Sequence, residues 1–140
     1  DLMSSPIRQP LVCFSSEWHV VTVIGNDNRV TVLDAATGAQ RGAFAEPDHL
    51  TKQYTCAAIQ SEQQASKGSK RPRHAPQPVL AVGTTSGAIL LWNTSKGAVK
   101  SSLAGEEGHH GAVHDLCFDK SGSSLFSVGS DSAALQWDVK

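Results

Sequence analysis

Apolar residues recur along this chain in short runs of about five residues, separated by turns rich in Gly, Ser, Asn and Asp. Runs of this length, bounded by such turn residues, predict β-strands, and two strands joined by a short polar turn predict a β-hairpin. None of the runs approaches the roughly 18 apolar residues of a membrane-spanning helix. We therefore expect an all-β protein with no membrane partner.

Three hairpins align with one another without a gap, at residues 23–34, 82–93 and 127–138. Each consists of an apolar strand, a turn of small and polar residues, and a second apolar strand that ends in a large side chain followed by Asp or Asn. Additional short runs flank the hairpins, at 11–14, 55–59 and 112–118 before them and at 40–44 and 98–103 after the first two. Four short strands per unit are typical of a propeller blade. The sequence thus predicts three blades, at about 10–45, 49–104 and 108–140.

The spacing of the units supports a repeat architecture. The distance from Asn93 to Asp138 is 45 residues, and that from Asp34 to Asn93 is 59, which falls to 41 without a polar insert at 61–78. Repeats of about 40 to 45 residues with Gly-His and Trp-Asp pairs are typical of WD repeats. The third unit contains both pairs, Gly108-His109 and Trp137-Asp138, and resembles a WD40 blade.

The resemblance implies a structural role for four residues of the third unit. In WD40 blades a His, a Ser or Thr, an Asp and a Trp form a hydrogen-bonded chain, and the matching residues here are His109, Ser127, Asp131 and Trp137. Such a network fixes the geometry of a blade because buried polar groups need partners.

The other two units depart from this pattern. The second has Asp48-His49 in place of Gly-His, and it has Val82, Ser86 and Trp92-Asn93 at the Ser, Asp and Trp-Asp positions. The first keeps Asp27 but has Val23 and Leu33 at the Ser and Trp positions, and no His precedes its first strand. We expect the hydrogen-bonded chain to be incomplete in both units. Burial of apolar side chains must then supply most of the stability of these two blades.

The insert at 61–78 is the outlier in composition. It contains Lys67, Lys70, Arg71 and Arg73 and no large apolar residue, which predicts a loop between the first two strands of the second blade. Clustered basic residues suit a nuclear-import signal or a contact with RNA phosphates. A solvated insertion without a specific role explains the same residues, and both interpretations stay open.

A more particular resemblance concerns the order of these features. A basic insert within the second blade, then Leu80 to Thr84, Gly87 to Leu91, Lys96-Gly97 and Gly108-His109, resembles the N-terminal part of a family of WD-repeat subunits of the nucleolar small-subunit processome. The resemblance implies a non-catalytic scaffold in the nucleolus. Its implied partners are other WD-repeat processome proteins and pre-ribosomal RNA, contacted directly or indirectly, with no small-molecule substrate.

Two other functions remain open at this stage. The ending Trp137-Asp138-Val139-Lys140 resembles the Trp-Asp-x-Arg/Lys pattern of WD proteins that serve as substrate receptors of cullin-type ubiquitin ligases. A general WD-repeat interaction scaffold, in the cytoplasm or in trafficking, is the third possibility.

The remaining chemistry favours no enzyme and no cofactor. The net charge is -1, so any basic binding surface must be local. Cys13, Cys56 and Cys117 form no Cys-x-x-Cys pair and lie in apolar runs, which predicts buried free thiols. His109, His110 and His114 lie near Cys117, but strand spacing separates them and disfavours a metal site. No phosphate-binding loop, nucleophile elbow or carboxylate pair is present.

Three blades are too few to close a ring, because propellers usually have about four to eight. We therefore expect a fragment of a larger propeller. Its end blades would expose unpaired strand edges and apolar faces, so we also expect it to fold poorly as an isolated monomer.

Overall fold

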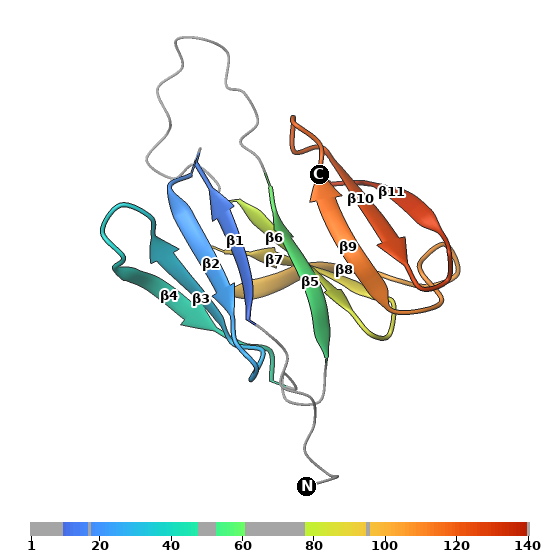
Figure 1. Cartoon of the computed structure of the whole chain (residues 1–140), viewed down its shortest axis with the longest axis horizontal. Helices are drawn as coiled ribbons and strands as arrows, with labels where there is room; N and C mark the ends of the chain where they lie inside the picture. Colours follow the sequence, from blue (N-terminus) through green and yellow to red (C-terminus); the bar gives the residue numbers. More distant parts are fainter. Residues whose placement is uncertain (1–9, 17, 48–52, 61–77, 95, 140) are drawn as a thin grey trace, which may run out of the picture.

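The structure is a computed structural model of the 140-residue chain, and it describes residues 10–16, 18–47, 53–60, 78–94 and 96–139. The regular elements of these ranges are β-strands, coloured along the sequence in Figure 1. The first sheet consists of β1 (Leu11–Ser15), β2 (Val20–Ile24), β3 (Val30–Asp34) and β4 (Gln40–Phe44). The second consists of β5 (Tyr54–Ile59), β6 (Val79–Thr84), β7 (Ile89–Asn93) and β8 (Ala98–Leu103). The third consists of β9 (Val113–Phe118), β10 (Ser124–Gly129) and β11 (Ala134–Asp138).

Within each sheet the strands pair antiparallel in chain order, β1-β2-β3-β4, β5-β6-β7-β8 and β9-β10-β11. Consecutive strands pair because each is joined to the next by a tight turn, apart from the insert between β5 and β6. This meander of three or four short strands is the architecture of a propeller blade. The expected fold class, an all-β partial propeller of about three blades, is confirmed.

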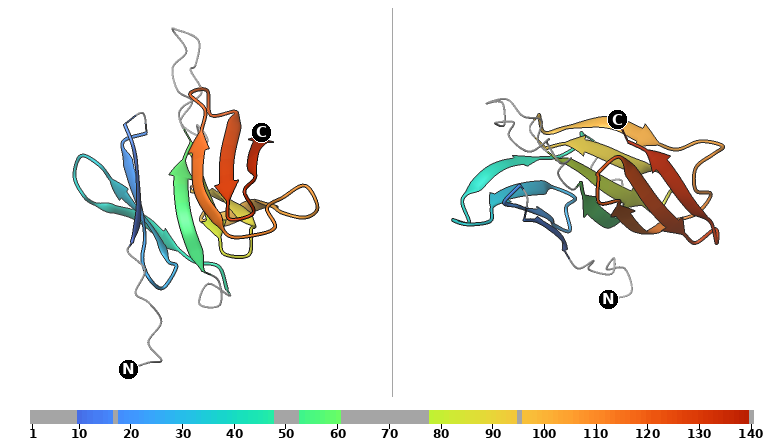
Figure 2. Two further views of the ribbon diagram at one scale, coloured as in Figure 1. Left: turned by 45° about the vertical axis from the view of Figure 1, so that its right-hand side comes forward. Right: turned by 90° about the horizontal axis from the view of Figure 1, so that it is seen from above.

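The first strand of each sheet lies at the centre of the molecule. β5 contacts both β1 and β9, and Figures 1 and 2 show these three strands side by side while the later strands of each sheet fan outward. The sheets therefore pack face to face around their first strands, with the second sheet in the middle.

The second sheet is buried on both faces. Successive side chains of a strand point to opposite faces, so β6 and β7 each supply residues to two separate apolar clusters. The cluster between the second and third sheets contains Cys56, Val79, Ala81, Ile89, Leu91, Val113, Leu116, Phe118, Leu125 and Val139. The cluster between the first and second sheets contains Ile24, Val30, Tyr54, Leu80, Val82, Leu90 and Trp92. The continuous apolar sequence of β6 and β7, without polar alternation, is explained by this double burial.

The three aligned hairpins adopt the same turn. In each, a residue with positive φ occupies the equivalent position, namely Asn28 (φ 61), Gly87 (φ 95) and Ser132 (φ 63). The backbone hydrogen bonds also correspond, with Asn28, Gly87 and Ser132 each donating to the carbonyl oxygen three residues earlier. Glycine adopts this conformation without strain, while Asn tolerates it better than most residues. The gapless alignment of the sequence thus reflects one conserved backbone geometry within the chain.

The cysteines depart in part from the expectation of buried free thiols. All three are free, and Cys56 is buried, but Cys13 is half-buried and Cys117 is exposed. Cys117 lies on β9, on the face of the third sheet that points away from the second sheet. The apolar run around it predicted a strand correctly, but a strand in an end sheet has one uncovered face.

Candidate functional site

The structure brings together the four residues that the WD40 resemblance singled out. His109 lies in the loop before β9, Ser127 lies on β10, Asp131 lies in the β10–β11 turn and Trp137 lies on β11. His109 Nε2 is 2.7 Å from Ser127 Oγ, and His109 Nδ1 is 3.0 Å from Asp131 Oδ1. Trp137 Nε1 donates to Ser127 Oγ at 2.9 Å. We name these four residues the His–Ser–Asp–Trp chain.

The donors and acceptors of this chain form one consistent sequence. The Trp137 indole N–H can only donate, so Ser127 Oγ accepts from it and is free to donate its own hydrogen to His109 Nε2. A neutral His109 then carries its proton on Nδ1 and donates it to the Asp131 carboxylate. Ser127 and His109 are 1% and 6% exposed, and their buried side-chain polar atoms all find partners among these four residues.

Asp131 is fixed by backbone groups as well. The backbone N–H of His110 donates to Asp131 Oδ2 at 2.9 Å, and the N–H of Ala133 donates to Oδ1 at 3.3 Å. These hydrogen bonds, with that of His109, stabilise the carboxylate form and hold the pKa of Asp131 at about 2, against an opposing effect of desolvation. The carboxylate therefore anchors both the turn and the preceding loop across the pH range near neutrality.

A Ser–His–Asp arrangement also invites comparison with a hydrolase triad. Two features of the geometry argue against that role. Ser127 is almost completely buried, facing the second sheet, and its oxygen already accepts the Trp137 N–H. A nucleophile must reach a substrate carbonyl, and a hydroxyl that is 1% exposed and held in two hydrogen bonds is poorly placed to do so.

Gly129 is a member of the site that the sequence analysis did not single out. A Cβ atom at this position would lie 2.7 Å from His109 Nδ1, 2.8 Å from Asp131 Oδ1 and 3.0 Å from Ala112 O. The His–Asp contact therefore requires glycine at the end of β10. In the sequence, Gly129 stands out only as the glycine that ends the strand before Ser130-Asp131. The folded structure is needed to show that the His109 and Asp131 side chains approach this glycine.

The second sheet lacks the equivalent hydrogen bonds. Val82 occupies the position of Ser127 and Trp92 occupies that of Trp137, in the same pairing register. Trp92 is 1% exposed, and its Nε1 has no hydrogen-bond partner. The ring instead packs against Phe44, with the two centroids 5.2 Å apart. His49 lies outside the described residues.

A shorter polar contact occupies the turn of the second sheet. Thr84 Oγ1 lies 2.9 Å from Ser86 Oγ and donates to the carbonyl oxygen of Ala88 at 2.8 Å. These hydrogen bonds join only residues in or beside the β6–β7 turn. The His–Ser–Asp–Trp chain, by contrast, joins the β10–β11 turn, two strands and the loop before β9. In the first sheet, Val23 and Leu33 occupy the corresponding positions on β2 and β3 and offer no side-chain donor or acceptor.

The Asp or Asn that follows the large residue has a local function in the first two sheets. Asp34 Oδ1 accepts the backbone N–H groups of Ala36 and Thr37 at 2.9 and 3.0 Å, and Asn93 Oδ1 accepts that of Lys96 at 3.1 Å. Such Asx contacts start a turn. The pKa of Asp34 is lowered to about 2, chiefly by the hydrogen bond from Arg41 and then by those of Thr37 and Ala36.

The basic residues Lys67, Lys70, Arg71 and Arg73 lie outside the described residues. The structure does describe the two positions that flank the insert. The Gln60 N–H donates to Val79 O at 2.9 Å, and the Val79 N–H donates to Gln60 Oε1 at 3.2 Å. Gln60 Nε2 also donates to Gly122 O at 2.6 Å, in the β9–β10 turn of the third sheet. The two positions that flank the insert are thus paired with each other, and Gln60 is also joined to the third sheet.

The other sequence candidates are separated in space. His110 lies in the loop before β9, while His114 lies on that strand. Across the described ranges, no group of three or more His, Cys, Asp or Glu residues is arranged to hold a metal ion. Over the same ranges, no helix has the length and apolar character required to cross a membrane. At the Trp-Asp ending, Asp138 is exposed and Val139 is buried, and Lys140 is outside the described part.

No protein-family model matches the chain. The chain is 27% identical over 123 residues to WD repeat-containing protein 43 of Homo sapiens, an alignment that covers 81% of this chain and 18% of that protein. It is 30% identical over 120 residues to nuclear distribution protein PAC1 of Coccidioides posadasii (strain C735), with 82% and 25% coverage. It is 34% identical over 64 residues to WD repeat-containing protein 75 of Danio rerio, with 46% and 8% coverage.

The blade-like sheets and these similarities together define the class of protein. The chain is similar to WD-repeat proteins, and its architecture is that of part of a WD-type β-propeller. It spans a quarter or less of the length of each of the three relatives. The similarity supports the general role of a WD-repeat scaffold.

Proposed function

We propose that this chain is part of a non-catalytic WD-repeat scaffold that acts in nucleolar ribosome biogenesis, in the assembly of the small-subunit processome on pre-ribosomal RNA. The observation that carries the proposal is the order of its features, a basic insert in the second unit followed by a third unit with both the Gly-His and the Trp-Asp pair. That order resembles the processome family, and the alignment with human WD repeat-containing protein 43 extends over 81% of the chain. Its partners on this proposal are other WD-repeat processome proteins and the RNA.

The geometry of the third sheet supports a scaffold. The polar side-chain groups of the His–Ser–Asp–Trp chain are hydrogen-bonded to one another. We propose that these four residues brace the blade. A rigid blade presents its turns and loops in fixed positions, which is what a protein-binding platform requires.

For the basic insert we propose a role as a nuclear-import signal or a contact for RNA phosphates. The positions on either side of the insert, Gln60 and Val79, are hydrogen-bonded to each other, so the strand pair closes at the point where the insert interrupts the sequence. The four basic residues would supply charge locally to a chain whose overall net charge is -1.

The test is the localisation of the tagged full-length protein, together with sequencing of the RNA that co-purifies with it. We expect a nucleolar signal and enrichment of pre-ribosomal RNA. Replacement of Lys67, Lys70, Arg71 and Arg73 by Gln should reduce the nucleolar signal or the RNA recovery. A control variant replaces Lys96, Lys100 and Lys120 by Gln, which removes three exposed positive charges from outside the insert.

The similarity to nuclear distribution protein PAC1 favours a second candidate, a WD-repeat scaffold with a role in nuclear distribution. The same purification separates the two. A diffuse cytoplasmic signal without pre-ribosomal RNA would contradict the processome proposal and favour this candidate. Recovery of a cullin-ligase adaptor would instead favour the substrate-receptor alternative suggested by the Trp-Asp ending.

A further inference from the structure

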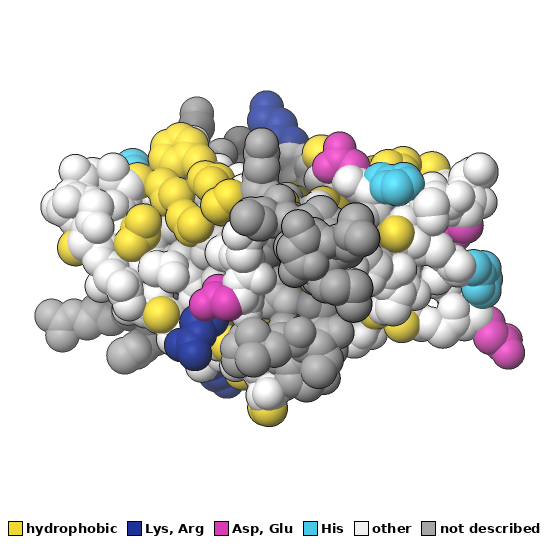
Figure 3. Space-filling view, turned by 60° about the horizontal axis from the view of Figure 1, so that its bottom comes forward, with side chains coloured by type: hydrophobic (Ala, Val, Ile, Leu, Met, Phe, Trp, Pro, Cys, Tyr) yellow, Lys and Arg dark blue, Asp and Glu magenta, His cyan; other side chains and the backbone are white. Residues whose placement is uncertain are grey.

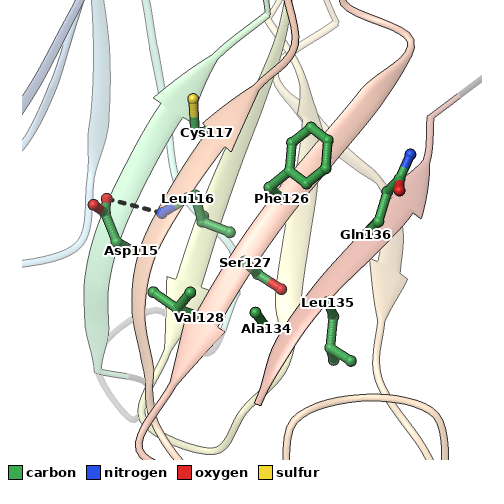
Figure 4. A pocket seen from close by; sticks show the side chains of 9 residues that line it. All are labelled: Asp115, Leu116, Cys117, Phe126, Ser127, Val128, Ala134, Leu135 and Gln136. Atoms are coloured by element: carbon green, nitrogen blue, oxygen red, sulfur yellow. Dashed lines mark hydrogen bonds between the residues drawn. The ribbon is translucent and has the colours of Figure 1, made fainter. Parts of the chain in front are cut away.

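Two features of the surface lie on the outward faces of the end sheets. Figure 3 shows exposed hydrophobic side chains gathered on the side of the first sheet, to the left of the view. Figure 4 shows the side chains that line a depression of about 390 Å³ on the third sheet, Phe126 and Val128 among them. In a propeller, adjoining sheets cover faces of this kind. These faces alone therefore identify no partner.

Gln60 makes a polar contact of another kind, because it joins two sheets that the structure describes. This residue comes directly after β5 and immediately before the insert. Its Nε2 donates to Gly122 O at 2.6 Å, in the β9–β10 turn, and Figure 1 shows this turn and the end of β5 at the same end of the molecule. Gly122 is buried, and its N–H donates to Asp119 O at 3.0 Å, which closes the turn. The residue that precedes the insert is thus attached to an ordered part of the neighbouring sheet.

The third sheet shows what Gln60 shares with the corresponding position of another sheet. Asp119 comes directly after β9, as Gln60 comes directly after β5. The Asp119 N–H donates to Ser124 O at 2.9 Å, and the Ser124 N–H donates to Asp119 Oδ1 at 3.0 Å. Gln60 and Val79 form the same two hydrogen bonds, at 2.9 and 3.2 Å. The same closure therefore spans residues 120–123 in the third sheet and the insert in the second.

Glutamine adds a hydrogen-bond donor that aspartate at this position lacks. An ionised carboxylate offers only acceptors, and Asp119 Oδ2 accepts the Ser121 hydroxyl of its own turn at 2.7 Å. The amide of Gln60 uses its oxygen to close the strand pair and its Nε2 to reach the third sheet. Closure of the strand pair does not require that second bond. The bond to Gly122 instead fixes the position from which the insert begins, relative to the third sheet.

The other end of the insert is attached to its own sheet. Pro78, the last residue of the insert, is buried, and its carbonyl oxygen accepts the Thr94 hydroxyl at 2.8 Å. Thr94 lies in the turn between β7 and β8 of the second sheet. Of these two side-chain contacts, the one from Gln60 reaches the third sheet, whereas the one from Thr94 stays within the second.

We infer that Gln60 is a positioning residue for a contact between the insert and the phosphates of RNA, an inference that rests on the proposed function. A nuclear-import signal is read as an extended peptide and does not require a fixed attachment to the third sheet. A contact with RNA on a folded scaffold gains from such an attachment, because a segment that is already oriented loses less conformational entropy on binding. The contact through Gln60 therefore favours RNA phosphates over nuclear import as the role of the basic insert.

The test measures binding of the full-length protein to a labelled oligouridine RNA by fluorescence anisotropy, over a range of salt concentrations. Gln60→Met keeps the length and the neutral charge of the side chain but loses the bond to Gly122. We expect about three- to ten-fold weaker binding, the effect of one hydrogen bond, with an unchanged dependence on salt because no phosphate contact is removed. Thr94→Val, the matched control, removes the hydrogen bond at the other end of the insert and should bind as the wild type does. Circular dichroism of each variant establishes that it has folded. The nuclear signal of Gln60→Met should be unchanged, and its loss would contradict the choice of RNA over import.

Combination with the charge variant separates this inference from the proposed function. Replacement of the four basic residues of the insert by Gln should weaken binding and reduce its dependence on salt. Adding Gln60→Met to that variant should weaken binding no further, because no contact is left to position. Wild-type affinity of the charge variant would overturn the proposed RNA contact itself. If the charge variant is weakened, an unaffected Gln60→Met variant, or an equal further loss in the combined variant, would overturn only the role of Gln60.

Discussion

At the scale of single residues, one hydroxyl group distinguishes the third sheet from the second. Ser127 joins His109 to Trp137, whereas Val82 at the same position leaves the buried Nε1 of Trp92 without an acceptor. A buried donor without a partner costs about 1–3 kcal/mol. The two sheets therefore offer a natural comparison, because the surrounding backbone register is the same.

Replacing Ser127 by Val should destabilise the protein by about 2 kcal/mol, because His109 Nε2 loses its partner in the interior and Trp137 Nε1 loses its acceptor. Denaturant unfolding, followed by circular dichroism, measures the change in the free energy of unfolding. An unchanged midpoint would show that the His–Ser–Asp–Trp chain does not brace the sheet.

The converse substitution tests the second sheet. Val82→Ser and Val82→Ala remove similar apolar volume, but only serine offers an acceptor to Trp92 Nε1. We expect the serine variant to be more stable than the alanine variant by about 1 kcal/mol, the typical contribution of one hydrogen bond. Equal stability would mean that the Trp92 indole cannot reach the new hydroxyl.

Acid should weaken the third sheet through Asp131. Its pKa is lowered to about 2 in the folded protein, so the carboxylate stabilises the fold above its usual pKa near 4. This contribution is lost as the pH falls from about 4 to about 2. Asp131→Asn should be less stable at neutral pH and should show a shallower loss of stability over that interval. Asp34 and Asp119 also have lowered pKa values, so part of the acid sensitivity will remain.

At the scale of elements, the hairpin turns of the second and third sheets both lie close against the loop that precedes β9. Gly129 permits the contact of His109 with Asp131. Gly87 of the second sheet, with φ 95, lies against the backbone of His109, where a Cβ atom would meet the carbonyl oxygen. Glycine at these positions serves packing and backbone conformation together.

We expect Gly129→Ala to cost about 1–3 kcal/mol, because the added methyl group overlaps His109 and Asp131. Gly42→Ala in β4 is the matched control, since no atom lies within 4 Å of the added carbon there. Thermal unfolding of the two variants should give a clear fall in Tm for the first and a small change for the second. Similar effects in both would contradict the role assigned to Gly129.

At the scale of the whole molecule, the two end sheets carry exposed large apolar side chains, Val12 and Phe14 on the first sheet and Phe126 and Val128 on the third. The second sheet is buried on both sides by its neighbours, but each end sheet is covered on one side only within the described residues. The expectation of poor folding as an isolated monomer stays a prediction.

We expect the isolated 140-residue chain to lack a sharp, cooperative unfolding transition as a monomer, because its end sheets expose apolar side chains and strand edges. Thermal unfolding followed by circular dichroism at several protein concentrations measures this. A sharp, reversible and concentration-independent transition of a monomeric chain would contradict the expectation.

The sequence by itself determined the strands, their order and their repeat. Short apolar runs between turn residues were sufficient because antiparallel neighbours joined by tight turns need only local information. The alignment of 23–34, 82–93 and 127–138 also placed the positive-φ position of each turn at the same point. The residues of the His–Ser–Asp–Trp chain could be selected from the WD40 resemblance, though no local pattern explains why they meet.

Only the tertiary structure decided which face of each strand is covered and by what. Cys56 and Cys117 both lie in apolar runs, yet one is buried and the other exposed, because only the first belongs to a sheet with neighbours on both sides. Three further features depend on how distant segments pack. Gly129 is needed because His109 and Asp131 approach it, Trp92 Nε1 is buried without an acceptor, and Gln60 donates to Gly122 O. The periodicity of a strand predicts which side chains share a face. Whether that face is buried depends on what packs against it, and this is decided by the arrangement of the sheets in space.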